Sequence, residues 1–255
     1  YKMKNNFIIL LLLIILINTI DSSQRFSNKN SLKIKLTDKQ QSMIKQAKTL
    51  EASGLINEAI IAYNNIFDQF PFLREAFLPL KTIYIKNNNL EEALKLSKKY
   101  LIANEYNNNV QIDVFEVYLL SNDKYWENII ESALSSKTKN YNNIKKILSL
   151  LLQYGKERKA INIIKDIQID KKSFYCLELG GYFSLKLDIE KAIDEYLIYL
   201  EDKPQNFKLI TQRIMLLSNN FSSLNNIIKK LNQSNLREAK LIYSKLEFKL
   251  KNFQK

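Results

Sequence analysis

The chain has 255 residues, 46% of them hydrophobic, with only four Gly, three Pro, one Cys and no His. This hydrophobic content is enough for a packed core, and so few turn-forming residues argue against an all-β fold. The lack of His excludes Ser-His and Cys-His nucleophiles and His-ligated metal sites in this chain, and a single Cys excludes an intramolecular disulfide.

The charge is strongly positive, with 39 Lys and Arg against 26 Asp and Glu and a net charge of +13. Such a charge favours an acidic partner or a nucleic-acid backbone. The lysines are scattered, however, and the densest clusters are only Lys98-Lys99 and Lys171-Lys172. Because a nucleic-acid surface concentrates Arg and aromatic residues in one basic patch, the composition argues against a nucleic-acid partner.

The first residues carry an export pattern. A short basic segment, Met3–Asn6, precedes eleven uninterrupted apolar residues, Phe7–Ile17. As a helix these span about 17 Å, well short of the roughly 30 Å hydrocarbon core, so residues 1–20 predict a signal peptide. No A-x-A cleavage site follows, and an uncleaved signal anchor is the alternative. Cleavage would start the mature protein between about Asp21 and Ser27, within a polar linker at residues 21–38.

Small residues then recur at a fixed period. Ala59 and Ala93 lie 34 residues apart, and Ala160 and Ala192 lie 32 residues apart. Each of these alanines opens the second half of a helix-like segment. A period near 34 residues made of two helices is typical of a helical-hairpin solenoid, in which neighbouring hairpins stack to bury their apolar faces. We therefore expect these four alanines to be buried at helix contacts.

Glycine and proline positions agree with this period independently. Gly54 and Gly155 fall at the predicted turn inside a hairpin, where a left-handed residue ends a helix. Pro71 and Pro204 fall between hairpins, because Pro cannot continue a helix. Gly180 falls within a first helix, at a position that predicts close helix packing. Asn-rich clusters at residues 87–89 and 107–109 mark further loops.

The best-matching unit resembles the tetratricopeptide repeat (TPR) family. The pattern of that family is W-x2-L-G-x2-Y, followed by A-x3-F and then P. Its matching residues, with Cys in place of Trp, are Cys176, Leu179, Gly180, Phe183, Ala192, Tyr196 and Pro204. The other units cover residues 40–73, 74–107, 109–136, 141–169 and 205–233. This resemblance, over residues 39–233, implies an all-α fold: a right-handed α-solenoid of about six helix-turn-helix repeats.

In that family the first helix of each repeat lines a concave groove. The resemblance therefore implies a protein-binding groove lined by Lys48, Leu78, Thr82, Lys86, Lys145, Gln153, Phe174 and Ser184. This mixture suits an extended or helical segment of another protein. The alternative is that several of these residues pack within an over-wound groove. Ile44 and Pro79 stand where some family members clamp a terminal carboxylate, so this clamp is absent, and Pro79 should kink its helix or make it start late.

Catalysis is not expected. The acidic pairs Glu91-Glu92, Asp194-Glu195 and Glu201-Asp202 should lie on outward helix faces, with no glycine loop or nucleophile beside them. Cys176 is expected to be a buried apolar residue. We predict a non-enzyme without a cofactor or metal.

The last segment, residues 234–255, predicts a helix over 235–253 that either caps the array or starts a further, truncated repeat. One apolar face carries Ala239, Tyr243, Leu246, Leu250 and Phe253. Leu241 and Phe248 form a second stripe on the opposite side. Helices that are apolar on two sides are usually covered on both, so we expect the natural chain to continue.

These features together predict an exported, periplasmic or envelope-associated scaffold that binds another protein or peptide through its concave groove. Membrane contact is expected only through an uncleaved N-terminal anchor. The alternative is the N-terminal repeat region of a longer envelope-associated enzyme or a secretion or transport component.

Overall fold

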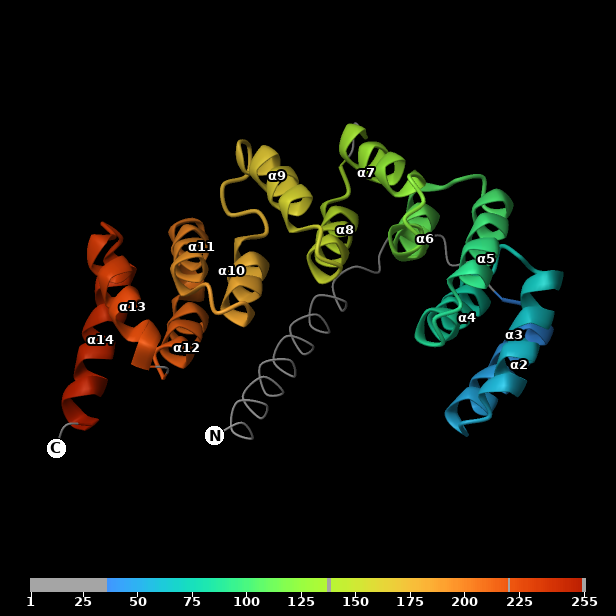
Figure 1. Cartoon of the computed structure of the whole chain (residues 1–255), viewed down its shortest axis with the longest axis horizontal. Coiled ribbons are helices and arrows are strands. Elements are labelled where there is room, and N and C mark those ends of the chain that lie inside the picture. The colour runs from blue at the N-terminus through green and yellow to red at the C-terminus, as the bar shows by residue number, and fades with distance from the viewer. Residues whose placement is uncertain (1–35, 137–138, 220, 254–255) are drawn as a thin grey trace. The chain divides into compact units, whose positions relative to one another are not determined.

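The structure, a computed structural model, describes residues 36–136, 139–219 and 221–253 (Figure 1). Within these residues the chain is all-helical, with thirteen α-helices, one 3-10 helix and no strand. The helices are α2 (Asp38–Ala52), α3 (Ile56–Gln69), α4 (Arg74–Lys86), α5 (Leu90–Ala103), α6 (Asn108–Leu120), α7 (Tyr125–Ser135), α8 (Tyr141–Gln153), α9 (Glu157–Gln168), α10 (Cys176–Leu185), α11 (Ile189–Asp202), η1 (Pro204–Asn206), α12 (Phe207–Leu217), α13 (Phe221–Gln233) and α14 (Arg237–Phe253).

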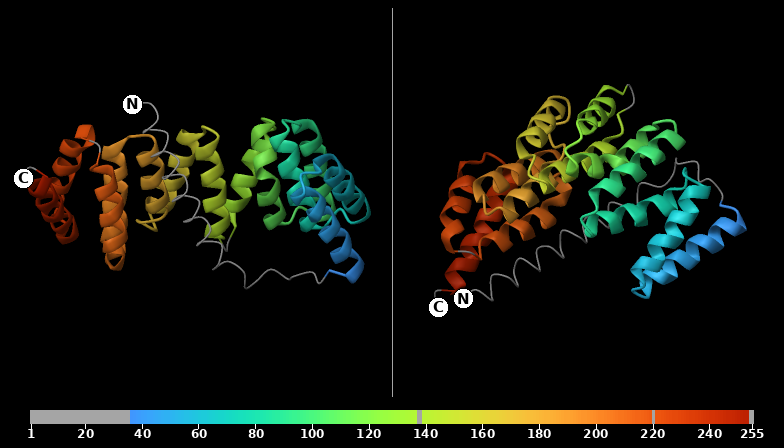
Figure 2. Two further views of the ribbon diagram at one scale, coloured as in Figure 1. Left: turned by 90° about the horizontal axis from the view of Figure 1, so that it is seen from below. Right: turned by 45° about the vertical axis from the view of Figure 1, so that its right-hand side comes forward.

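The described residues divide into two compact units between Lys156 and Glu157. The N-terminal unit holds α2 to α8, and the C-terminal unit holds α9 to α14. Within each unit, helices adjacent in sequence pack as hairpins, such as α2 on α3, α4 on α5 and α10 on α11 (Figures 1 and 2). Alternate helices also contact each other, as α4 does α6 and α6 does α8. The predicted all-α array of helix pairs is therefore confirmed.

Five of the turns between successive helices each contain one residue in the left-handed conformation. These residues are Gly54 (φ 78°), Asn88 (56°), Asn122 (53°), Gly155 (75°) and Leu187 (61°). In every case the following N–H bonds to the carbonyl five residues back, as from Leu55 to Leu50 at 3.0 Å and from Asp188 to Phe183 at 3.0 Å. This Schellman pattern satisfies carbonyls that the helix end leaves unpaired, so the same turn starts each second helix.

The four period-setting residues occupy close helix contacts, as predicted. Ala59, Ala93, Ala160 and Ala192 are all fully buried, with 0% exposure. Gly180 is also at a close approach, because a Cβ there would lie 2.6 Å from the ring of Tyr196 on the partner helix. A larger side chain at such a position would force the two helices apart.

The three prolines occupy two kinds of position, between helices and inside a helix. Pro71 lies in the turn between α3 and α4, and Pro204 opens η1 between α11 and α12, both as predicted. Pro79 instead lies inside α4, which begins at Arg74, so the predicted late start is wrong. The ring removes the N–H partner of the Glu75 carbonyl, and Glu75 lies in the exposed first turn, where water can replace that bond.

The last helix, α14, has one buried and one exposed side. Ala239, Ile242 and Leu246 are fully buried, whereas Leu241 is 44% and Phe248 72% exposed. The predicted second apolar stripe therefore faces outward. The predicted signal or anchor at residues 1–20 and most of the 21–38 linker lie outside the described residues. Within the described ranges, the search for a helix with the length and apolarity of a membrane span finds none.

Candidate protein-binding surface

The predicted groove residues are divided between the two units. Six lie on first helices of the N-terminal unit, either exposed (Lys48, Thr82, Lys86, Gln153) or half-buried (Leu78, Lys145). The remaining two, Phe174 and Ser184, lie in the C-terminal unit and are only 8% and 7% exposed. The surface-accessible candidates therefore lie on α2, α4 and α8 of the N-terminal unit.

The two buried candidates have partners within the C-terminal unit. The Ser184 hydroxyl donates to the Gly180 carbonyl at 2.7 Å and shares a hydrogen bond with the Tyr196 hydroxyl at 3.2 Å. The Phe174 carbonyl, just before α10, accepts a hydrogen bond from the Gln168 side chain at 3.0 Å. Ser184 therefore bonds within its hairpin and Phe174 lies against the end of α9, and little of the surface of either residue is available to a ligand.

A charged network that the sequence did not reveal joins α4 to α6. The Arg74 guanidinium donates two hydrogen bonds to the Asp113 carboxylate, at 2.6 and 2.7 Å. Lys81 Nζ lies 3.1 Å from both the Asp113 carbonyl and the Glu116 carboxylate. The hydrogen bonds to Asp113 raise the pKa of Arg74. Because these charges already pair with one another, the network holds α4 and α6 in register and offers no free catalytic group.

The same network reaches the end of α8 through Tyr154. Its hydroxyl donates to Glu116 at 2.8 Å. Burial, and then this hydrogen bond, raise the pKa of Tyr154 to about 12. Glu116, on α6, therefore links the first helices of three successive pairs, which are α4, α6 and α8. The only sequence signal was a pair of opposite charges about one repeat apart, such as Lys81 and Glu116, and that signal is weak without side-chain geometry.

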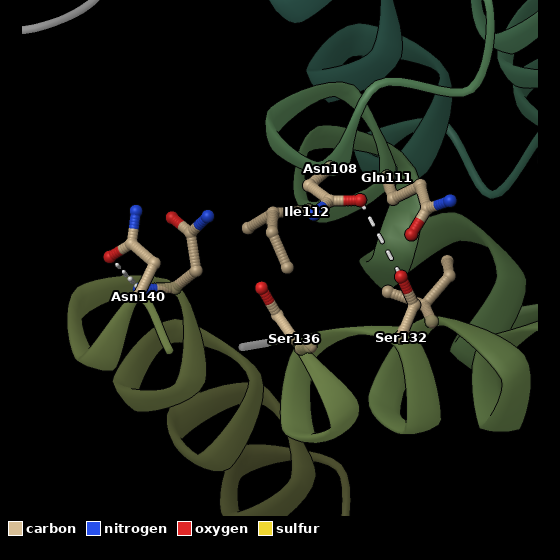
Figure 3. Close-up of a pocket in the computed structure, with 9 residues that line it drawn as sticks. Asn108, Gln111, Ile112, Ser132, Ser136 and Asn140 are labelled. Atoms are coloured by element: carbon tan, nitrogen blue, oxygen red, sulfur yellow. Dashed lines mark hydrogen bonds between the residues drawn. The ribbon is translucent and has the colours of Figure 1, made fainter. Parts of the chain in front are cut away.

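A small pocket lies where the N-terminal ends of α6 and α8 meet the C-terminal end of α7 (Figure 3). Its volume of about 30 Å³ has room for a water molecule or two. The described residues that line it are uncharged: Asn108, Gln111, Ile112, Ile129, Ser132, Ala133, Ser136, Asn140 and Asn143. Most of their side chains carry amides or hydroxyls.

Side-chain amides and hydroxyls organise this pocket. Asn140 caps α8 by accepting from the N–H groups of Asn142 and Asn143, at 3.1 and 3.3 Å. Asn143 in turn donates to Asn109 on α6 at 3.1 Å, and Ser132 lies 3.5 Å from Asn108. An amide has both a donor and an acceptor, which matches the N–H and C=O of a peptide backbone. In the sequence alone, the Asn107–Asn109 cluster indicates only a loop.

The acidic pairs show no catalytic arrangement. Lys95 pairs with Glu91 and Glu92, Lys230 with Asp194, and Lys172 with Glu201. Across the described ranges there is no group of His, Cys, Asp and Glu that could hold a metal.

Glu195 differs from the expected outward position. It is half-buried beside the fully buried Cys176. Burial, with a smaller contribution from Asp194, raises the pKa of Glu195, and burial likewise raises the pKa of the Cys176 thiol. A thiol held protonated is a poor nucleophile, so the predicted structural role of Cys176 agrees with its surroundings.

These features define an all-α repeat protein with TPR-like helix pairs. No protein-family model matches the chain, and no curated protein matches it. Among solved structures, the chain is similar to one described as "Crystal structure of MamA protein", with a TM-score of 0.43 and 17% sequence identity over 66% of this chain and 94% of that one. A similarity this low says nothing about activity or partners, and the assignment of fold depends on the helix pairs themselves.

Proposed function

We propose that this chain is an exported scaffold that binds a segment of another protein through the first helices of its N-terminal unit and performs no catalysis. The observation that carries this proposal is the amide pocket at the N-terminal ends of α6 and α8, whose Asn143 lies two residues before the predicted groove residue Lys145. Peptide recognition needs donors and acceptors for the backbone together with apolar and charged neighbours for side chains.

The composition of the surface also favours a peptide over a metabolite. The pocket is too small for a drug-sized ligand, since sites for such ligands are typically about 300–1,000 Å³. One small side chain of a peptide fits it better, and the exposed Lys48, Thr82, Lys86 and Gln153 lie on α2, α4 and α8 of the same unit. Export is part of the proposal because of the apolar segment at residues 7–17.

The binding proposal can be tested with a displayed library of random peptides. Peptides selected on the full chain should protect the backbone amides of α6 and α8 from hydrogen exchange. Asn143→Ala should weaken their binding about two- to tenfold, because one lost hydrogen bond is worth roughly 0.5–1.5 kcal/mol. Asn225→Ala, at an exposed position of α13, is the matched control. Selected peptides that bind Asn143→Ala as well as the unchanged chain would refute this site.

Export can be tested separately by mass-spectrometric mapping of the N-terminus of protein expressed with its natural leader. A start between about Asp21 and Ser27 is the expected result for a cleaved signal. Intact Met3 on membrane-associated protein would instead indicate the anchor.

A further inference from the structure

The outer face of α14 is apolar at two positions that nothing described in the structure covers. Helix α14 packs on α12 and α13 and lies at one edge of the C-terminal unit (dark red in Figure 1). Its buried side is formed by Ala239, Ile242 and Leu246. Leu241 and Phe248 lie on the opposite side, 44% and 72% exposed, and seven residues of helix separate them by about 10.5 Å.

The residues around this pair are cationic or neutral. At about 100° per residue, Arg237, Ser244 and Lys245 lie within about 50° of the line through Leu241 and Phe248. All three side chains are exposed. The two carboxylates of the helix lie farther round, and that of Glu247 accepts a hydrogen bond from Tyr243 at 2.7 Å. The outer face of α14 thus combines bulky apolar and positive side chains without a central acidic one.

The surrounding segment carries most of the positive charge of the chain. Residues 207–255 contain ten Lys and Arg and two Glu, a net charge of +8 out of +13 for the whole chain. Residues 36–156 are nearly balanced, with fifteen basic and thirteen acidic residues. A second copy would meet this face with the same positive charge, so self-association is disfavoured. The charge instead selects an anionic occupant.

We propose that the outer face of α14 binds an anionic lipid bilayer, with Leu241 and Phe248 entering the boundary between headgroups and acyl chains. Arg237 lies on this face beside them, and the Lys245 ammonium lies at its margin, 4.8 Å from the centroid of the Phe207 ring on α12. These are the positions that lipid phosphates would occupy. A bilayer fits better than an acidic peptide because this face is the convex side of a single helix. The pocket proposed above for a peptide lies in the other unit. Helices with an apolar stripe flanked by Lys and Arg bind in this way, parallel to the surface.

This contact is separate from the proposed function and from the predicted N-terminal anchor. It would orient the C-terminal unit on a membrane whether or not residues 1–20 remain attached, and it adds a second membrane contact to the one expected from the sequence. It is a surface contact and requires no spanning helix.

A fluorescent reporter on α14 itself tests the proposal. Ser244→Cys, between the two apolar residues, can be labelled selectively with an environment-sensitive fluorophore because Cys176 is fully buried. The label reports only the surroundings of α14, so attachment of the chain through its apolar N-terminal segment gives no signal. Asn162→Cys, at an exposed position of α9, provides the matched control label.

Vesicles of equal parts phosphatidylcholine and phosphatidylglycerol should shift the emission of the α14 label to shorter wavelength, and pure phosphatidylcholine should not. The affinity should fall at least tenfold for Leu241→Ser combined with Phe248→Ser, and also for Arg237→Glu combined with Lys245→Glu. Ile169→Ser and Lys159→Glu, which change exposed residues elsewhere in the same unit, should leave it unchanged. All substituted side chains are exposed, so circular dichroism should show the same helicity throughout.

Three results would overturn the proposal: no shift with anionic vesicles, an equal shift with neutral vesicles, or a shift at the Asn162→Cys control label as large as on α14. A response to polyglutamate in place of vesicles would likewise overturn it and assign the face to an acidic protein.

Discussion

Buried alanines lie at helix contacts in both units, but the two units differ in one further kind of contact. In the N-terminal unit, charged side chains connect α4 to α6, and Tyr154 extends the connection to α8. In the C-terminal unit, small residues allow the helices to approach closely, as Gly180 does against Tyr196. Close packing depends on volume, whereas a charged network depends on donor and acceptor geometry. The two units should therefore respond differently to changes in side-chain size and charge.

The largest expected effect tests whether the units unfold separately. Phe77 is fully buried in the N-terminal unit and stacks on Tyr100 with ring centroids 4.0 Å apart. Phe77→Ala should lower the free energy of unfolding by about 3–5 kcal/mol, because it removes a large side chain from a packed core. Hydrogen exchange should show the loss in α3 to α6 and unchanged protection in α10 to α13. Equal loss in both units would show that they unfold together.

Close packing in the C-terminal unit can be tested at Gly180 and Ala192. Gly180→Ala and Ala192→Leu should each cost about 1–3 kcal/mol by overpacking. The sign of the stability change at Gly180 is decisive, because Ala in place of an unhindered helical Gly would stabilise the chain by about 1 kcal/mol. Denaturant unfolding followed by circular dichroism measures both variants. An unchanged or raised stability would contradict the close approach.

The charged network should contribute less. A double-mutant cycle on Arg74→Ala and Asp113→Ala should give a coupling of about 1 kcal/mol, since Arg74 is 55% exposed and solvent screens the pair. The coupling should shrink in high salt. The same cycle on the exposed pair Lys99 and Asp68, 3.6 Å apart, is the control and should give a coupling close to zero.

Leu187 offers a small gain in stability. Its left-handed backbone costs a residue with a Cβ about 1–2 kcal/mol, and its side chain is 70% exposed, so burial does not offset that cost. Gly also adds entropy to the unfolded chain, which offsets part of the gain. Leu187→Gly should therefore raise the midpoint of thermal unfolding only slightly. Asn88→Gly should change it less, because Asn tolerates this conformation.

The smallest effect is a pH dependence at Glu195. Burial raises the pKa of Glu195 in the folded state above its ordinary value of 4.5, so the folded chain keeps a proton that the unfolded chain releases. Its stabilising contribution is complete below pH 4.5 and is lost as pH rises through the folded pKa. Glu195→Gln should flatten this decline in thermal midpoint, and Glu190→Gln, at an exposed position of α11, should not.

Much of the fold could be predicted because backbone-level constraints leave a mark on the sequence. Gly54 and Gly155 adopt the left-handed turn, and Gly180 lies at a close approach, since few other residues meet these demands. The same turn at Asn88 and Leu187 escaped prediction, because neither residue type requires a left-handed backbone. Tertiary packing imposes it there.

The candidate site was harder to predict. The sequence placed Ser184 at a groove position by repeat phase alone, but its hydroxyl bonds inside its own hairpin. The amide pocket was missed because its members come from three helices, and Asn is also the ordinary residue of loops and caps. The position of a residue within a repeat predicts which side of its helix carries the side chain. It does not predict which neighbouring residue that side contacts.

The repeated left-handed turn has a consequence for how such a chain can change in length. Because Gly54 and Asn88 have the same backbone conformation and each precedes a second helix, deleting residues 55–88 would join Gly54 to Asn89 and leave an intact turn between α2 and α5. Duplication of the same segment would likewise create no new kind of junction. Insertion or loss of whole repeats is therefore compatible with turns of this kind, whereas a deletion of a few residues within a helix would shift its buried face.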